Sequence, residues 1–171
     1  LDFVYRECEE VSGLMGDRDG IGQLHFGGGT PTYIGLEGLT NVLTRLRSHF
    51  DLLPGCEMSI EVDPRTAGPQ VVTDLRQLGF NRISFGVQDF DPDVQKAIGR
   101  FQSTDRVREV LNAAREADYS GINFDLIYGL PQQTPQSFAQ TLTTTIEMRP
   151  DRIALYSFAY LPRLRPNQAS I

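Results

Sequence analysis

The sequence predicts an α/β fold in which parallel strands form a full or partial barrel with helices on the outside. Two observations carry this prediction. Short β-rich segments alternate with longer helical segments, and connections of that length favour parallel strands with crossover helices over hairpins. Polar side chains also recur on one face of several strands, although buried parallel strands usually consist of continuous apolar runs.

Six helices are expected, and most have a recognisable pattern or boundary. Leu1–Met15 and Gly35–Phe50 each carry apolar residues at helical spacing on one side. Pro69–Leu78 ends before Gly79, as a helix followed by a C-terminal glycine does. Two later helices begin with an Asp-Pro or Thr-Pro pair, which places a capping residue before a proline at the first helical position. The later helices are Asp91–Ile98, Thr104–Ala117 and Pro135–Met148.

Five strands are expected between these helices. They are Gly22–Gly27, Glu57–Asp63, Arg82–Val87, Gly121–Ile127 and Arg152–Phe158. From the second strand to the fourth, apolar residues alternate with polar or small ones. The apolar set is Met58, Ile60, Val62, Ile83, Phe85, Val87, Ile122, Phe124 and Leu126. The opposite set is Ser59, Glu61, Asp63, Ser84, Gly86, Gln88, Asn123 and Asp125. One face of the sheet is therefore expected to take the helices, and the other face is polar.

The polar face has two interpretations. It can be an open sheet face in contact with water, or it can line a cavity that holds a polar ligand. We favour the cavity, because the long crossovers disfavour the antiparallel pairing that is common in open sheets. Glu61, Gln88 and Asp125 lie late in or just after their strands, at the edge where α/β proteins bind ligands.

The Gly27–Thr30 segment follows the first strand and is a candidate binding loop. Three glycines let the backbone approach a ligand closely, although a plain loop also explains many glycine runs. Its spacing matches neither of the common nucleotide-phosphate loops. Arg100 can pair with a ligand carboxylate or lie solvated at the surface. His25 alternates with Leu24 and Phe26, and we expect a packed rather than a catalytic side chain.

Composition restricts the function classes. The net charge is −6 at pH 7, and no clustered basic face suggests a nucleic-acid partner. No apolar run reaches the roughly 20 residues of a membrane span, and no secretory signal is evident. Two cysteines, Cys8 and Cys56, do not make a disulfide framework. We therefore expect a cytoplasmic protein without nucleic-acid or membrane partners.

Five sequence motifs lie in order along the chain. They are HFGGGTPTY (25–33), SIEVDPR (59–65), GFNRISFGVQDF (79–90), NFDLIYGLP (123–131) and YSFAYLP (156–162). Together they resemble the radical S-adenosylmethionine superfamily and, more narrowly, the oxygen-independent coproporphyrinogen III oxidase family. A haem chaperone shares this core, but the second and fifth motifs favour the oxidase. The resemblance runs from about Gln23 to Pro162 and implies a partial (β/α) barrel of the radical SAM type.

The resemblance implies an S-adenosylmethionine site formed by Gly28, Gly29, Thr30, Glu61, Gln88, Arg100, Asp125 and Ala159. The three loop residues would hold the amino-acid end of the cofactor, largely through backbone groups, and Arg100 would pair with its carboxylate. Glu61 and Gln88 would hydrogen-bond its amino and ribose groups. Asp125 would add a polar contact, and the backbone of Ala159 would line the pocket. No catalytic residue or metal ligand is expected within the chain.

The chain departs from the family pattern in its cysteines. Cys8 and Cys56 cannot replace the CxxxCxxC loop, which supplies three thiolate ligands to a [4Fe–4S] cluster. We interpret residues 1–171 as a single incomplete radical SAM core domain. The strand that carries the cluster loop and the C-terminal domain would then lie outside this sequence, and the isolated chain is expected to be inactive.

For the full-length enzyme, the resemblance implies oxidative decarboxylation of coproporphyrinogen III to protoporphyrinogen IX in haem biosynthesis, with electrons from a separate donor. Adenosylmethionine, cleaved at the reduced cluster, would supply the radical that takes a hydrogen atom from a propionate side chain. Loss of carbon dioxide and an electron would leave a vinyl group, and the protein would supply orientation. Two alternatives stay open: the haem chaperone, which binds and delivers haem, and an unrelated βα-barrel metabolic enzyme.

Overall fold

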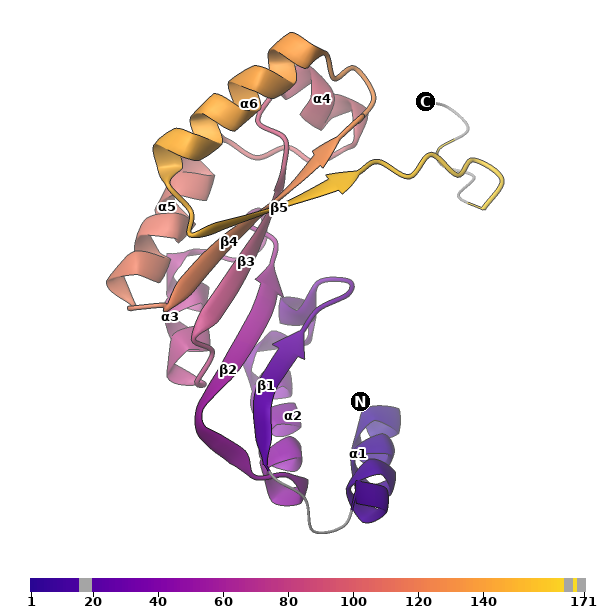
Figure 1. Cartoon of the computed structure of the whole chain (residues 1–171), viewed down its shortest axis with the longest axis vertical. Coiled ribbons are helices and arrows are strands. Elements are labelled where there is room, and N and C mark those ends of the chain that lie inside the picture. Colours follow the sequence, from indigo (N-terminus) through magenta and orange to yellow (C-terminus); the bar gives the residue numbers. More distant parts are fainter. Residues whose placement is uncertain (16–19, 165–167, 169–171) are drawn as a thin grey trace.

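The computed structural model describes residues 1–15, 20–164 and 168 (Figure 1). Within them, one sheet contains five parallel strands in the order β1-β2-β3-β4-β5. The strands are β1 (Ile21–Phe26), β2 (Leu52–Val62), β3 (Arg82–Gln88), β4 (Gly121–Tyr128) and β5 (Arg152–Ser157). Each strand thus pairs with its neighbours in sequence, and the twisted sheet forms a curled half-barrel. The predicted α/β fold and partial barrel are confirmed.

The connections between the strands are helical. The helices are α1 (Asp2–Met15), α2 (Gly35–His49), α3 (Pro69–Gln77), α4 (Pro92–Ala97), α5 (Thr104–Glu116) and α6 (Pro135–Met148), with a 3-10 helix, η1 (Pro31–Ile34), before α2. All six predicted helices are present, whereas η1 is an additional element. The main boundary difference is in β2, which begins at Leu52 instead of Glu57 because Leu52 already pairs with Ile21 before a shift in register.

Side-chain caps account for the sharp starts of the later helices. The Asp91 carboxylate accepts hydrogen bonds from the backbone N–H groups of Asp93 and Val94 at the start of α4. Thr134 and Ser137 form a reciprocal capping box at the start of α6. The two capping residues predicted from the Asp-Pro and Thr-Pro pairs are therefore confirmed.

The hydrophobic core lies between the helices and one face of the sheet. The apolar residues predicted to face it in β2, β3 and β4 are all buried. Phe85 and Phe124 meet edge to face across β3 and β4, with ring centroids 6.3 Å apart. On the opposite face Ser59, Glu61 and Asn123 are only partly buried. The predicted separation of an apolar and a polar face is confirmed.

In the part of the chain that the structure describes, no helix combines the length and apolar character needed to cross a membrane.

Candidate functional site

A cavity of about 160 Å³ lies on the polar face, at the carboxyl-terminal edge of the sheet. Seven of the eight residues predicted for the cofactor site line it: Gly28, Gly29, Thr30, Glu61, Gln88, Arg100 and Asp125. Val62, Asp63 and Gly86 complete the lining. The loop after β1, the ends of β2 and β3, the middle of β4 and the loop between α4 and α5 therefore meet at one place.

Ala159 is the predicted site residue that the structure does not bring to this cavity. It lies just after β5, is exposed, and its carbonyl accepts a hydrogen bond from Gln168 Nε2 at 3.2 Å. The chain leaves the sheet at this point (Figure 1). A contact between Ala159 and a ligand stays a prediction.

The glycine loop is fastened to β2 through Glu61. The backbone N–H of Gly28 donates to Glu61 Oε2 at 3.1 Å, and Gly28 has a φ of 104°, which favours glycine. Gly27 is a position of close approach. A Cβ atom there would lie 2.4 Å from His25 Nε2 and 2.8 Å from Glu61 Oε1. The loop therefore contains glycines both for backbone conformation and for close approach.

His25 lies on the polar face beside Glu61. Its side chain is 57% exposed, and Nε2 is 3.4 Å from Glu61 Oε1. Nδ1 is 2.8 Å from Ser59 Oγ. The expectation of a packed histidine is wrong, because His25 points to the face opposite Leu24 and Phe26. His25 is therefore a polar neighbour of the glycine loop, which the alternation in β1 already indicates.

Gln88 ends β3 in a backbone conformation that is unusual for a residue with a side chain. Its φ is 67°, and the N–H of Asp89 donates to the carbonyl of Val87 at 2.9 Å across it. A three-residue turn with positive φ at its centre is rare and strained. Gln102 stabilises this turn, because its Nε2 donates to the same Val87 carbonyl at 2.5 Å. The turn directs Gln88 to the cavity, and the pairing with β4 shifts register there.

Asp125 is held within the polar face by its neighbours. Oδ2 accepts from Ser84 Oγ at 2.9 Å, and Oδ1 accepts from Asn123 Nδ2 at 2.8 Å. Burial raises the pKa of Asp125. The hydrogen bonds from Ser84 and Asn123 oppose that shift, but the nearby charge of Glu61 adds to it, and the net pKa lies above its usual value. A bound cation would favour the ionised carboxylate.

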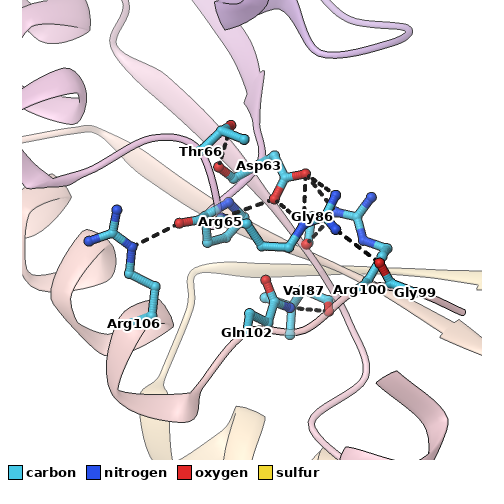
Figure 2. Close-up of polar contacts among 10 residues, drawn as sticks. Asp63, Arg65, Thr66, Gly86, Val87, Gly99, Arg100, Gln102 and Arg106 are labelled. Atoms are coloured by element: carbon cyan, nitrogen blue, oxygen red, sulfur yellow. Dashed lines mark hydrogen bonds and ion pairs between the residues drawn. The ribbon is translucent and has the colours of Figure 1, made fainter. Parts of the chain in front are cut away.

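Arg100 reaches the cavity from the loop between α4 and α5 (Figure 2). Its Nη2 donates to Asp63 Oδ2 at 3.2 Å and to the carbonyl of Gly86 at 3.3 Å. Its Nε is buried and has no hydrogen-bond partner among the residues that the structure describes. Since Arg100 lines the cavity and its guanidinium makes only one contact with a carboxylate, it is the cationic group there that can bind a ligand carboxylate.

Asp63 is the buried carboxylate behind Arg100. Its exposure is 7%, and it forms ion pairs with both Arg65 and Arg100. Burial raises the pKa of Asp63, but the hydrogen bonds from Arg65 and the charges of the two arginines outweigh burial, and the net pKa lies below its usual value. The sequence places Asp63 at the strand end but gives no sign that it pairs with two arginines.

The charges around the cavity are unevenly distributed. Arg100 is the guanidinium among the lining residues, and Glu61, Asp63 and Asp125 are the carboxylates. Asp63 is already paired with Arg65 and Arg100, whereas Glu61 and Asp125 line the cavity from β2 and β4. The arrangement suits a ligand with a carboxylate at the Arg100 side and positive or hydroxyl-bearing groups over the sheet.

Residues 3–144 match the model of the Radical SAM superfamily. The chain belongs to this superfamily. It is 47% identical over 164 residues to the oxygen-independent coproporphyrinogen III oxidase of Pseudomonas aeruginosa. The matched residues cover 95% of this chain and 36% of that protein. The corresponding protein of Escherichia coli K12 is 43% identical over 171 residues, covering 100% of this chain and 37% of that protein. The chain thus spans little more than a third of the length of these curated relatives.

Solved structures agree with this assignment. Escherichia coli coproporphyrinogen III oxidase (HemN), described as a radical SAM enzyme, superposes with a TM-score of 0.94 at 42% identity, covering 99% of this chain and 39% of that chain. The radical SAM methyltransferase TsrM from Kitasatospora setae gives a TM-score of 0.67 at 14% identity, covering 91% of this chain and 30% of that chain. The second likeness shows the fold alone.

Membership of the radical SAM superfamily implies S-adenosylmethionine and a [4Fe–4S] cluster as cofactors. The cavity fits adenosylmethionine, which carries one carboxylate, an ammonium and a sulfonium. Arg100 offers a guanidinium to the carboxylate, and Glu61 and Asp125 offer negative charge to the cationic groups.

The described residues do not fit the iron–sulfur cluster. No group of three or more Cys, His, Asp or Glu side chains that could hold a metal ion occurs among residues 1–15, 20–164 and 168. Cys8 in α1 and Cys56 in β2 are both buried free thiols. The prediction that these two cysteines do not replace the cluster motif is consistent with their burial in separate elements.

Proposed function

We propose that this chain is the adenosylmethionine-binding core of an oxygen-independent coproporphyrinogen III oxidase. In its full length, that enzyme would convert coproporphyrinogen III to protoporphyrinogen IX by oxidative decarboxylation in haem biosynthesis. The observation that carries the proposal is the 42% identity and TM-score of 0.94 to the Escherichia coli oxidase over 99% of the chain. The convergence of seven predicted site residues on one cavity supports it.

The residues of the cavity have distinct proposed roles. Backbone groups of Gly28, Gly29 and Thr30 hold the amino-acid end of adenosylmethionine, and Arg100 binds its carboxylate. Glu61 and Gln88 hydrogen-bond its amino and ribose groups, Asp125 adds a polar contact, and the backbone of Ala159 lines the pocket. Adenosylmethionine supplies the capacity to abstract a hydrogen atom from a substrate propionate, and these residues bind and orient it.

The ligands of the [4Fe–4S] cluster would come from a segment outside residues 1–171. Three clustered thiolates are needed, and the chain has two cysteines. We therefore treat the chain as one incomplete radical SAM core domain and expect the parent gene to encode a CxxxCxxC motif upstream of Leu1. The isolated chain should produce no 5′-deoxyadenosine above a no-protein control after reconstitution with iron and sulfide.

The partners are part of the proposal. Coproporphyrinogen III is the substrate, a separate redox protein or reductant donates electrons, and neither nucleic acid nor a membrane takes part. Both cysteines are free thiols, which supports a location in the reducing cytoplasm.

Turnover by the full-length protein tests the function. The anaerobically purified and reconstituted enzyme should convert coproporphyrinogen III to protoporphyrinogen IX with consumption of adenosylmethionine, followed by porphyrin fluorescence after oxidation. An Arg100→Gln variant should lose most of this activity. Stoichiometric haem binding without decarboxylation would instead identify the haem chaperone. If neither decarboxylation nor haem binding is found, another barrel enzyme is indicated.

A further inference from the structure

The Asp63 carboxylate is shared unequally between two arginines (Figure 2). Arg65 binds it side-on: Nε lies 3.0 Å from Oδ1, and Nη2 lies 2.7 Å from Oδ2. Arg100 makes a single contact with the same group, from Nη2 to Oδ2 at 3.2 Å. Arg65 is therefore the main partner of Asp63, and Arg100 is the minor one.

Arg65 also spans the gap between β2 and the loop that carries Arg100. Its backbone N–H donates to Asp63 Oδ1 at 3.0 Å, and its Nη1 donates to the carbonyl of Gly99 at 3.3 Å. One arginine thus contacts the carboxylate and the residue immediately before Arg100. Figure 2 shows the Arg65 side chain lying along this path.

Backbone hydrogen bonds fix the frame on both sides of this bridge. On the β2 side, the N–H groups of Thr66 and Ala67 donate to the carbonyl of Asp63 at 3.1 and 3.0 Å. Arg106 Nε donates to the carbonyl of Pro64 at 3.0 Å. On the other side, the N–H of Arg100 donates to the carbonyl of Gln95 at 2.9 Å. The backbone on each side is therefore held locally, and Arg106 links the segment after β2 to α5.

We propose that Asp63 and Arg65 are a positioning pair that holds Arg100 in place while leaving its guanidinium available to the ligand carboxylate. The inference rests on the proposed adenosylmethionine site. Arg65 does not line the cavity, so its effect on a ligand passes through Asp63 and Arg100.

Competition for one carboxylate explains why two arginines are needed. An isolated aspartate–arginine pair tends to close into a bidentate contact, which occupies both donors of the guanidinium fork. Because Arg65 already binds Asp63 side-on, Arg100 makes one contact with Asp63 and its side chain still lines the cavity. Without Arg65, Asp63 could close on Arg100, and the ligand carboxylate would have to displace it.

Two ligands that differ only in the carboxylate test the inference in the full-length protein. The dissociation constants of adenosylmethionine and decarboxylated adenosylmethionine are measured by calorimetry for wild type, Arg65→Gln, Asp63→Asn and Arg100→Gln. Arg65→Gln should weaken adenosylmethionine binding about tenfold and leave the decarboxylated ligand within about twofold. Asp63→Asn should lower the same selectivity, because Arg100 loses its anchor. A loss of folding alone would weaken both ligands equally.

Arg76→Gln is the matched control, since Arg76 Nε also donates to a backbone carbonyl, that of Asp118 at 3.3 Å, away from the cavity. Its selectivity should equal that of wild type. If Arg100→Gln lowers the selectivity but Arg65→Gln and Asp63→Asn do not, the positioning pair is ruled out. If Arg100→Gln itself leaves the selectivity unchanged, the proposed cofactor site fails instead. Should Asp63→Asn not fold, Arg65→Gln decides the question, because its side chain lies outside the cavity.

Discussion

Gly27 lies so close to His25 that a Cβ atom at position 27 would fall 2.4 Å from His25 Nε2. The same atom would lie 2.8 Å from Glu61 Oε1. The ends of two side chains thus lie against the backbone at the start of the cavity loop. Glu61 in turn accepts from the N–H of Gly28. A single methyl group at Gly27 would therefore disturb both the loop and the carboxylate that holds it.

Gly27→Ala should weaken adenosylmethionine binding by about threefold, because the ends of His25 and Glu61 must move and Glu61 also accepts the hydrogen bond of Gly28. Gly22→Ala, in the strand β1 that precedes the loop, is the control, since a Cβ atom there meets nothing within 4 Å. Equilibrium dialysis of both full-length variants measures the effect. Equal affinities for the two variants would show that the loop tolerates a side chain at position 27.

The backbone at Gln88 allows a stability test. An alanine at a position with φ of 67° costs more than a glycine, so Gln88→Gly should unfold with a free energy about 1 kcal/mol above that of Gln88→Ala. The exposed helical residue Asn112 in α5 should show the opposite order, with Asn112→Ala the more stable by about 1 kcal/mol. Urea titrations measure both pairs. The same order at both positions would contradict strain at Gln88.

The alternating faces of the sheet could be predicted from sequence because side-chain direction in a strand is a local property with a period of two. Ile83, Phe85 and Val87 face the core for this reason, and Asp125 faces the cavity. The helix starts at Asp91 and Thr134 are likewise local. The convergence of the strand ends then follows from parallel order.

The remaining features depend on contacts between distant segments. Nothing near Asp63 in the sequence indicates that Arg100 contacts it, because the α4–α5 loop must first fold over the sheet. The positive φ of Gln88 depends on a turn held by Gln102. Ala159 was predicted from the family motif alone, and its surroundings after β5 show no contact with the cavity. Tertiary geometry, not local pattern, decides these residues.

Asp125 should show opposite effects on binding and stability. Because burial raises its pKa, the ionised carboxylate is less favourable in the folded than in the unfolded protein, and this cost grows as the pH rises through the folded pKa. Asp125→Asn removes the charge, so at pH 7 it should be at least as stable as wild type while binding adenosylmethionine about tenfold more weakly.

Ser84→Ala provides the contrast to Asp125→Asn. It keeps the Asp125 charge but removes a hydrogen bond that favours it, and should lower stability at pH 7 by about 1 kcal/mol. Thermal unfolding and calorimetry measure the two quantities. Clear destabilisation by Asp125→Asn would show that the ionised carboxylate is favourable in the folded protein.

Asp63 should make acid stability depend on its two arginines. Its pKa is lowered on folding, so its contribution is present above the unfolded pKa of about 3.9 and is lost as the pH falls through the lower folded pKa. Asp63→Asn should therefore cost about 2 kcal/mol at pH 7, a value reduced by the partial exposure of Arg65 and Arg100. Below about pH 4 the difference from wild type should shrink, because wild type loses the charge as well.

Asp51→Asn, which alters an exposed carboxylate between α2 and β2, should show no comparable change in denaturant titrations at pH 7, 5 and 3. A difference for Asp63→Asn that grows toward low pH would reverse the assigned sign and exclude the arginines as the source of the stabilisation.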